Sequence, residues 1–165
     1  MQPRILLASV LCVAGLACGK SDDSADRRLL ELRPVLATTP PPCADQAPKG
    51  VDAVLPLTAD GKVAECLALG EPIVDAKDVR SATVNDTPAG VPALSVVLGG
   101  IGSAELDGFA ARNQGQRLAI LADGNLVNAP VVRFTSFAGR VQVTGLSKEK
   151  TDDLFRRLNK LIKSD

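Results

Sequence analysis

The sequence has no histidine, tryptophan or tyrosine, and only four phenylalanines among 165 residues. The absence of histidine removes the usual general base near neutral pH and the commonest metal ligand. The scarcity of aromatic rings removes the platforms on which single-stranded nucleic acid stacks. Lysine and arginine number 19, as do aspartate and glutamate, so no basic field attracts nucleic acid. We therefore expect no nucleic-acid partner.

Catalytic patterns are also missing. The sequence contains no Ser–His or Cys–His arrangement and no pair of carboxylates in a recognisable acid–base pattern. We therefore expect no catalytic residue, no bound cofactor and no metal site. The segment "GGIG" at residues 99–102 lies between a predicted strand and a predicted helix, where phosphate-binding loops occur. It lacks the lysine and the wider spacing of a P-loop, which favours a turn over a phosphate site.

The N-terminus has the pattern of an export signal. A short basic region at 1–4 precedes 13 charge-free residues, 5–17, whereas a membrane-spanning helix needs about 20 apolar residues. The segment ends in "GLAC", with the small residue Ala17 before Cys18, and this resembles a bacterial lipobox in which the thiol is acylated. Gly15 stands where a leucine is usual. The sequence predicts a signal peptide at 1–17 and lipidation of Cys18; the alternative is an ordinary secretory signal in which Cys18 is incidental.

The residues after Cys18 are polar and charged, and they cannot bury enough apolar surface to order themselves. We therefore expect a lipidated cysteine with a flexible tether over residues 18–28 and one domain over residues 29–165. No later segment approaches a membrane-spanning length, so attachment to the membrane is expected through the lipid alone.

Two cysteines, Cys43 and Cys66, follow the lipobox. An exported compartment permits oxidation, so a Cys43–Cys66 disulfide is one interpretation. It would contribute about 3 kcal/mol of stability in the chain-entropy account. Two independent buried thiols are the other interpretation. Two sulfurs without histidine are too few ligands for a metal.

The body of the chain mixes strand and helix patterns. Strands are expected at 29–37, 91–100 and 140–145, and a hairpin of two strands is expected at 52–70 with its turn at Asp60-Gly61. Pro34 places the first strand at a sheet edge or marks a bulge. Helices are expected at 74–82 after Asp75, at 103–115 after Ser103, and at 147–165 after Ser147. This order predicts an α+β fold, with two or three helices packed on a mostly antiparallel sheet.

The segment "RLAILADGNLVNAPVV", residues 117–132, is the strongest local pattern. Asp123-Gly124 between two apolar runs predicts a two-residue hairpin turn. Such a turn sets Ala122, Leu121 and Ile120 opposite Asn125, Leu126 and Val127. Pro130 cannot donate a backbone hydrogen bond, so the second strand ends, bulges or lies at an edge there.

The same segment resembles the first periplasmic domain of the SecD protein-export family, whose pattern reads approximately N-x-G-K-R-L-A-I-V-L-D-G-x-V-x-S-A-P-V-I. Matching residues are Asn113, Gly115, Arg117, Leu118, Ala119, Ile120, Asp123, Gly124, Ala129, Pro130 and Val131. The likeness runs from about Leu29 to Ile162. It departs from the family pattern at Leu106, where a phenylalanine is usual, and at Ala110, where a threonine is common.

The resemblance implies a head domain on the exported side of the membrane that contacts translocating polypeptide and has no known enzymatic chemistry. Asp123, Gly124 and Pro130 are then structural turn residues. We expect an envelope lipoprotein that binds polypeptide in or near protein export; the alternative is an assembly module that docks one envelope partner. Gly19 is not the aspartate that commonly retains lipoproteins in an inner membrane, which favours an outer membrane if the cell has two.

Overall fold

The structure is a computed structural model that describes residues 23–44, 46–59 and 61–164. The predicted signal peptide, Cys18 and the first residues of the predicted tether lie outside the described residues. The elements in chain order are α1 (Asp23–Arg27), β1 (Leu30–Thr39), β2 (Ala53–Ala59), β3 (Lys62–Leu69), β4 (Val74–Asp75), the 3₁₀ turn η1 (Ala76–Asp78), β5 (Val79–Asp86), β6 (Pro92–Leu98), α2 (Gly100–Arg112), β7 (Leu118–Ala122), β8 (Asn125–Asn128), β9 (Arg140–Thr144) and α3 (Lys148–Ile162).

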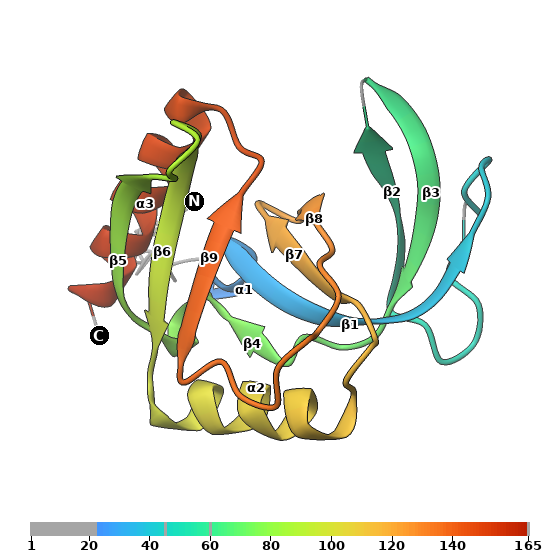
Figure 1. Cartoon of the computed structure of the whole chain (residues 1–165), viewed down its shortest axis with the longest axis horizontal. Helices are drawn as coiled ribbons and strands as arrows, with labels where there is room; N and C mark the ends of the chain where they lie inside the picture. The colour runs from blue at the N-terminus through green and yellow to red at the C-terminus, as the bar shows by residue number, and fades with distance from the viewer. Residues whose placement is uncertain (1–22, 45, 60, 165) are drawn as a thin grey trace, which may run out of the picture.

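The strands form two sheets (Figure 1). The larger sheet has the order β2-β3-β1-β7-β8, with β4 paired to β1, and the smaller sheet has the order β5-β6-β9. Every strand pair among the described residues is antiparallel. The α+β fold class is therefore confirmed, although the single expected sheet is divided in two.

Strands β1 and β7 serve two hydrophobic cores because their side chains alternate between two faces. One face, with Leu30, Leu32 and Ile120, packs into the main core together with the smaller sheet, α2 and α3. The other face, with Val35 and Leu121, packs against β2, β3 and β8 in a second, smaller core. The larger sheet therefore has a buried face on each side of its centre.

Helix α3 forms as its sequence predicts. The Ser147 side chain accepts a hydrogen bond from the Lys150 backbone N–H, which satisfies one of the free donors of the first turn. Leu154, Leu158 and Leu161 are buried on one stripe of the helix. Helix α3 packs mainly on β5, and Figure 1 shows α2 running along the bottom of the molecule, beneath the strands.

Three local expectations need correction. Residues 23–27, expected as part of a flexible tether, form the short helix α1, and Arg27 bonds the Asp75 carboxylate at 2.8 Å. The predicted helix at 74–82 is only the single turn η1, capped by Asp75, because β5 begins at Val79 and pairs with β6. Helix α2 begins at Gly100 with Gly99 as its N-cap, so Ser103 lies inside the helix.

The start of α2 is set by a tertiary contact rather than by a capping side chain. The Gly99 N–H donates to the Asp78 carbonyl at 2.7 Å. A Cβ atom on Gly102 would lie 2.6 Å from the Asp78 Cβ atom, so only glycine permits this approach. The "GGIG" segment is thus the first turn of a helix closed against η1.

Pro34 is not at a sheet edge, because β1 lies between β3 and β7. It lies where the neighbour of β1 changes: β4 pairs with Glu31 and Leu32, and β3 pairs from Val35 onward with a register shift after Val35. The alternative of a bulge near Pro34 is therefore confirmed. The missing N–H of the proline falls in the gap between these two partners.

Candidate functional site

A surface groove of about 620 Å³ lies between the β7–β8 hairpin, the connection from β9 to α3, and the first half of α3. Its apolar part is formed by five residues, Ala122, Leu126, Val127, Leu146 and Leu154. Its polar part is formed by Thr58 of β2, Asp123, Asn125, Glu149, Lys150, Asp153 and Arg157, with Gly145 at the end of β9. An apolar floor with a few convergent polar groups is typical of a binding surface.

The hairpin turn at one side of the groove has the conformation that its sequence predicts. Asp123 and Gly124 both have positive φ, at 52° and 71°, which is the requirement of a type I′ turn. Their N–H groups donate to the carbonyls of Leu29 and Arg28 at 3.3 and 3.2 Å. The turn is therefore tied to the chain that leads into β1.

The register of the hairpin agrees with the prediction near the turn and departs from it farther away. Ala122 lies opposite Asn125, and Leu121 lies opposite Leu126. A register shift then sets Ile120 opposite Asn128 instead of Val127. Strand β8 ends at Asn128, two residues before Pro130, and the Pro130 carbonyl accepts the Leu118 N–H at 2.9 Å.

Asp123 is bound by Arg157 of α3, a partner that sequence reasoning missed. Two guanidinium nitrogens donate to the two carboxylate oxygens at 2.7 and 2.6 Å, and Arg157 also forms an ion pair with Asp153 at 2.8 Å. The hydrogen bond to Asp123 is the main reason that the pKa of Arg157 is raised. No local pattern marks this pair, because 34 residues separate its members.

Strand β8 presents an open edge beside the groove. It is the last strand of the larger sheet, and β7 is its only strand partner among residues 23–44, 46–59 and 61–164. In an antiparallel hairpin, the pair next to a two-residue turn exchanges hydrogen bonds, so the following residue directs its N–H and C=O outward. Leu126, which lines the groove, holds that position.

Buried and partly buried ion pairs brace the larger sheet. Arg33 of β1, 8% exposed, bonds Glu31 at 2.9 Å and also bonds Asp52. Burial lowers the pKa of Arg33, but the hydrogen bonds to both carboxylates outweigh this and leave it raised. Arg117 pairs with Glu65 of β3 and donates to the Ala129 carbonyl at 2.9 Å. These contacts are internal, and we assign them to the fold.

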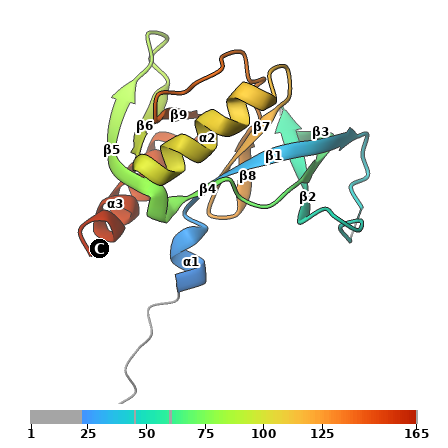
Figure 2. The same cartoon turned by 90° about the horizontal axis from the view of Figure 1, so that it is seen from below.

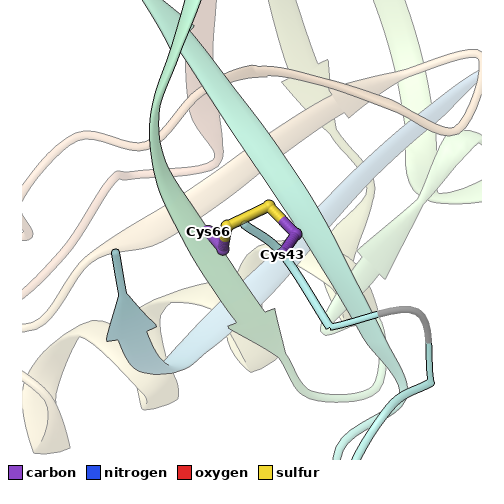
Figure 3. The surroundings of a disulfide bond; sticks show 2 residues. All are labelled: Cys43 and Cys66. Carbon is purple, nitrogen blue, oxygen red and sulfur yellow. A yellow bond between two sulfur atoms is a disulfide. The ribbon is translucent and has the colours of Figure 1, made fainter. Parts of the chain in front are cut away.

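The connection between β1 and β2 is attached to β3 by a disulfide. Figure 3 shows Cys43 joined to Cys66, with a Cα–Cα distance of 5.3 Å. Cys66 is fully buried in the strand, whereas Cys43 lies in the proline-rich connection. The bridge fixes one end of that connection to the sheet, and neither cysteine lines the groove.

The described part of the chain contains no group of three or more His, Cys, Asp or Glu side chains that could hold a metal ion. Among the same residues, no helix has the length and the apolar character needed to cross a membrane. The residues that line the groove offer hydrogen bonding, ion pairing and apolar contact.

Comparison with known proteins identifies a family. The family model described as "SecDF, P1 head subdomain" matches residues 53–160. The protein translocase subunit SecD of Acetobacter pasteurianus is 30% identical over 129 residues, which cover 77% of this chain and 23% of that protein. SecD of Aquifex aeolicus is 35% identical over 74 residues, or 45% of this chain and 15% of that protein. The chain thus spans less than a quarter of these relatives.

Two solved structures share the fold. A structure of SecDF, described as a membrane component that enhances protein export, superposes with a TM-score of 0.59 at 21% identity. The match covers 81% of this chain and 63% of the other. SecDF in its super-membrane-facing form gives a TM-score of 0.57 at 20% identity, over 84% of this chain and 19% of the other.

Proposed function

Because this chain belongs to the SecDF P1 head family, we propose that it is an envelope lipoprotein whose head domain binds extended polypeptide in or near protein export. The relatives that share the domain are subunits of a protein translocase. In this proposal Cys18 carries the lipid, residues 1–17 are removed, and the domain lies on the exported side of the membrane.

The observation that carries the proposal is the groove beside the open edge of β8. An extended polypeptide can add to such an edge through main-chain hydrogen bonds, which do not depend on its sequence. Leu126 would supply the outward N–H and C=O groups. Val127 and Leu146 would receive apolar side chains of the bound segment. This combination suits a binder of many unrelated chains.

The surrounding charges suit the same role. Asp123 and Asp153 are already paired with Arg157, and Glu149 and Lys150 stand at the groove with opposite charge. Such a rim has no strong preference for one sign of charge in its ligand. Selection would then depend on extended conformation and apolar content.

A binding measurement with purified protein tests this proposal. The probe is a fluorescein-labelled, permanently unfolded exported protein, and the readout is fluorescence anisotropy. Thr58→Arg places a large cation at the groove, whereas Thr38→Arg makes the same change at an exposed strand position that does not line it. We expect Thr58→Arg to weaken binding at least tenfold and Thr38→Arg to change it less than twofold.

The second candidate, an assembly module with one envelope partner, predicts a different result. The unlabelled wild-type chain would then fail to bind the unfolded probe at micromolar concentration. A photo-crosslinker at Thr58 in cells would give a single stoichiometric adduct instead of a distribution of exported chains. Either result would overturn polypeptide binding as the function of the groove.

A further inference from the structure

The charged side chains on the exposed side of α3 are mainly acidic near its N-terminus and basic near its C-terminus. Carboxylates dominate the first half, at Glu149, Asp152 and Asp153, with Lys148 and Lys150 among them. Arg156, Lys160 and Lys163 occupy the second half. Their spacings of four and three residues place them on one stripe, opposite the buried stripe of the helix. All three are exposed to solvent.

This basic half lies beside α1, the first described element. The Arg28 carbonyl accepts the N–H of Gly124, and the neighbouring Asp123 binds Arg157 of α3. The turn η1 contacts both α1 and α3. Figure 2 shows α1 and the C-terminal end of α3 on the same, lower side of the molecule.

Two acidic side chains at this end, Asp75 and Asp78, accept internal hydrogen bonds, whereas Asp26 of α1 is partly exposed. Asp75 accepts hydrogen bonds from Arg27 and from the Lys77 backbone N–H, and its side chain is 15% exposed. Asp78 accepts the Asp75 backbone N–H at 3.0 Å. By contrast, Arg28 and Lys77 are exposed. We call Arg28, Lys77, Arg156, Lys160 and Lys163 the basic face.

The length of chain before α1 places this face close to the proposed lipid. Asp23 lies five positions after Cys18 in the sequence, and an extended chain advances at most about 3.5 Å per residue. The start of α1 therefore lies within about 18 Å of an acylated Cys18. Electrostatic attraction to a charged surface acts within about one Debye length, 8 Å at physiological salt. A tilt of the domain about the short segment that joins it to Cys18 would therefore bring the basic face within range.

We propose that the basic face rests on anionic phospholipid headgroups and thereby sets the orientation of the domain on the membrane. This inference rests on the lipid anchor of the proposed function. Arg156, which also pairs with Asp153 at 3.1 Å, lies with Lys160 and Lys163 on the exposed stripe of α3, and Figure 2 shows the C-terminal end of α3 on the same side of the molecule as α1.

Vesicle partitioning tests the proposal with the full chain carrying Cys18→Ser, so that no acyl group contributes. The probes are vesicles of phosphatidylcholine alone and of phosphatidylcholine with one quarter phosphatidylglycerol, at 150 mM salt. The measured quantity is the ratio of partition coefficients between the two compositions. The N-terminal apolar segment is common to every variant, so differences in this ratio report the domain surface.

The test variant is Arg156→Gln/Lys160→Gln/Lys163→Gln, and the matched control is Lys49→Gln/Lys62→Gln/Arg140→Gln. Both remove three exposed cations. A cation near an anionic surface favours binding by about fivefold. We expect the test variant to lose at least tenfold of the anionic preference, the control to lose less than threefold, and 0.5 M salt to abolish the difference.

Equal losses in the two variants would overturn the proposal, because net charge and not this face would then decide binding. Absence of any anionic preference in the parent chain would overturn it as well. The variants lie at exposed positions, and circular dichroism confirms that each is folded. Failure of the anchor itself is detected separately, through the processing of wild-type Cys18.

Discussion

The Asp123 carboxylate in the β7–β8 turn and the Arg157 guanidinium on α3 form a two-pronged ion pair, with oxygen–nitrogen distances of 2.7 and 2.6 Å. This pair links the hairpin to the C-terminal helix across one side of the groove. The turn pattern in the sequence assigns Asp123 to the turn alone. The structure gives the carboxylate a second role.

Asp123→Asn keeps the turn conformation, because asparagine also tolerates positive φ, but it weakens the bond to Arg157. Both side chains are at least 40% exposed, so we expect a coupling free energy of only about 0.5–1 kcal/mol. A double-mutant cycle with Arg157→Gln, followed by urea unfolding at low and high salt, measures it. If the two substitutions changed the free energy of unfolding additively, the Asp123–Arg157 pair would not be stabilising. Loss of polypeptide binding in Asp123→Asn with unchanged unfolding would make Asp123 a ligand-binding group.

Gly124→Val tests the backbone requirement of the same turn. A Cβ atom at Gly124 would meet no other atom within 4 Å, so the cost comes from the left-handed conformation alone. We expect a loss of about 1–2 kcal/mol in the free energy of unfolding. Gly124→Asn is the matched control and should lose less, since asparagine adopts positive φ more readily. Equal losses would show that the turn rearranges.

Two glycines of α2 should respond in opposite directions to alanine. Gly108→Ala adds a methyl group that meets only the flexible end of Arg112, at 3.4 Å, and should stabilise the helix by up to about 1 kcal/mol. Gly102→Ala would place its Cβ atom 2.6 Å from Asp78 and should destabilise the protein by about 1–3 kcal/mol. Urea unfolding of both variants decides the signs. Stabilisation by Gly102→Ala would contradict the contact between α2 and η1.

Cys43 and Cys66 should be unreactive toward alkylating agents in denatured, unreduced protein purified from the envelope. Peptide mapping by mass spectrometry identifies the labelled cysteines. Reduction should make both reactive and lower the free energy of unfolding by about 3 kcal/mol, as expected when a loop of this size is released. If both residues were labelled before reduction, the disulfide would be refuted, whereas the fold described above would not be affected.

Cys18→Ser tests the anchor. If Cys18 is the acylated first residue of the mature protein, the variant should remain uncleaved or move to the soluble fraction. Cell fractionation and the mass of the wild-type N-terminal peptide measure both. An acyl chain contributes about 0.8 kcal/mol per buried methylene, so several chains hold a protein firmly. A variant that stays membrane-bound and correctly processed would refute the lipid anchor.

Elements with local signals follow from the amino-acid sequence alone. The Asp123-Gly124 turn, the Ser147 cap and the apolar stripe of α3 depend on residues within a few positions of one another, so spacing alone predicts them. The hairpin turning at Asp60-Gly61 was predicted for the same reason, and β2 and β3 pair on either side of it. The ordered set of motifs in the sequence also identifies the family.

Only the tertiary structure decided contacts between distant residues. Helix α2 begins at Gly100 instead of after Ser103 because Asp78 closes against it. The chain around Arg27 is helical and paired with Asp75, although its composition predicts a tether. Arg33 is buried because Glu31 and Asp52 meet it there, and Arg157 meets Asp123 across 34 residues of chain. Such pairs stabilise the fold only after distant segments have packed together, so no local pattern in the sequence records them.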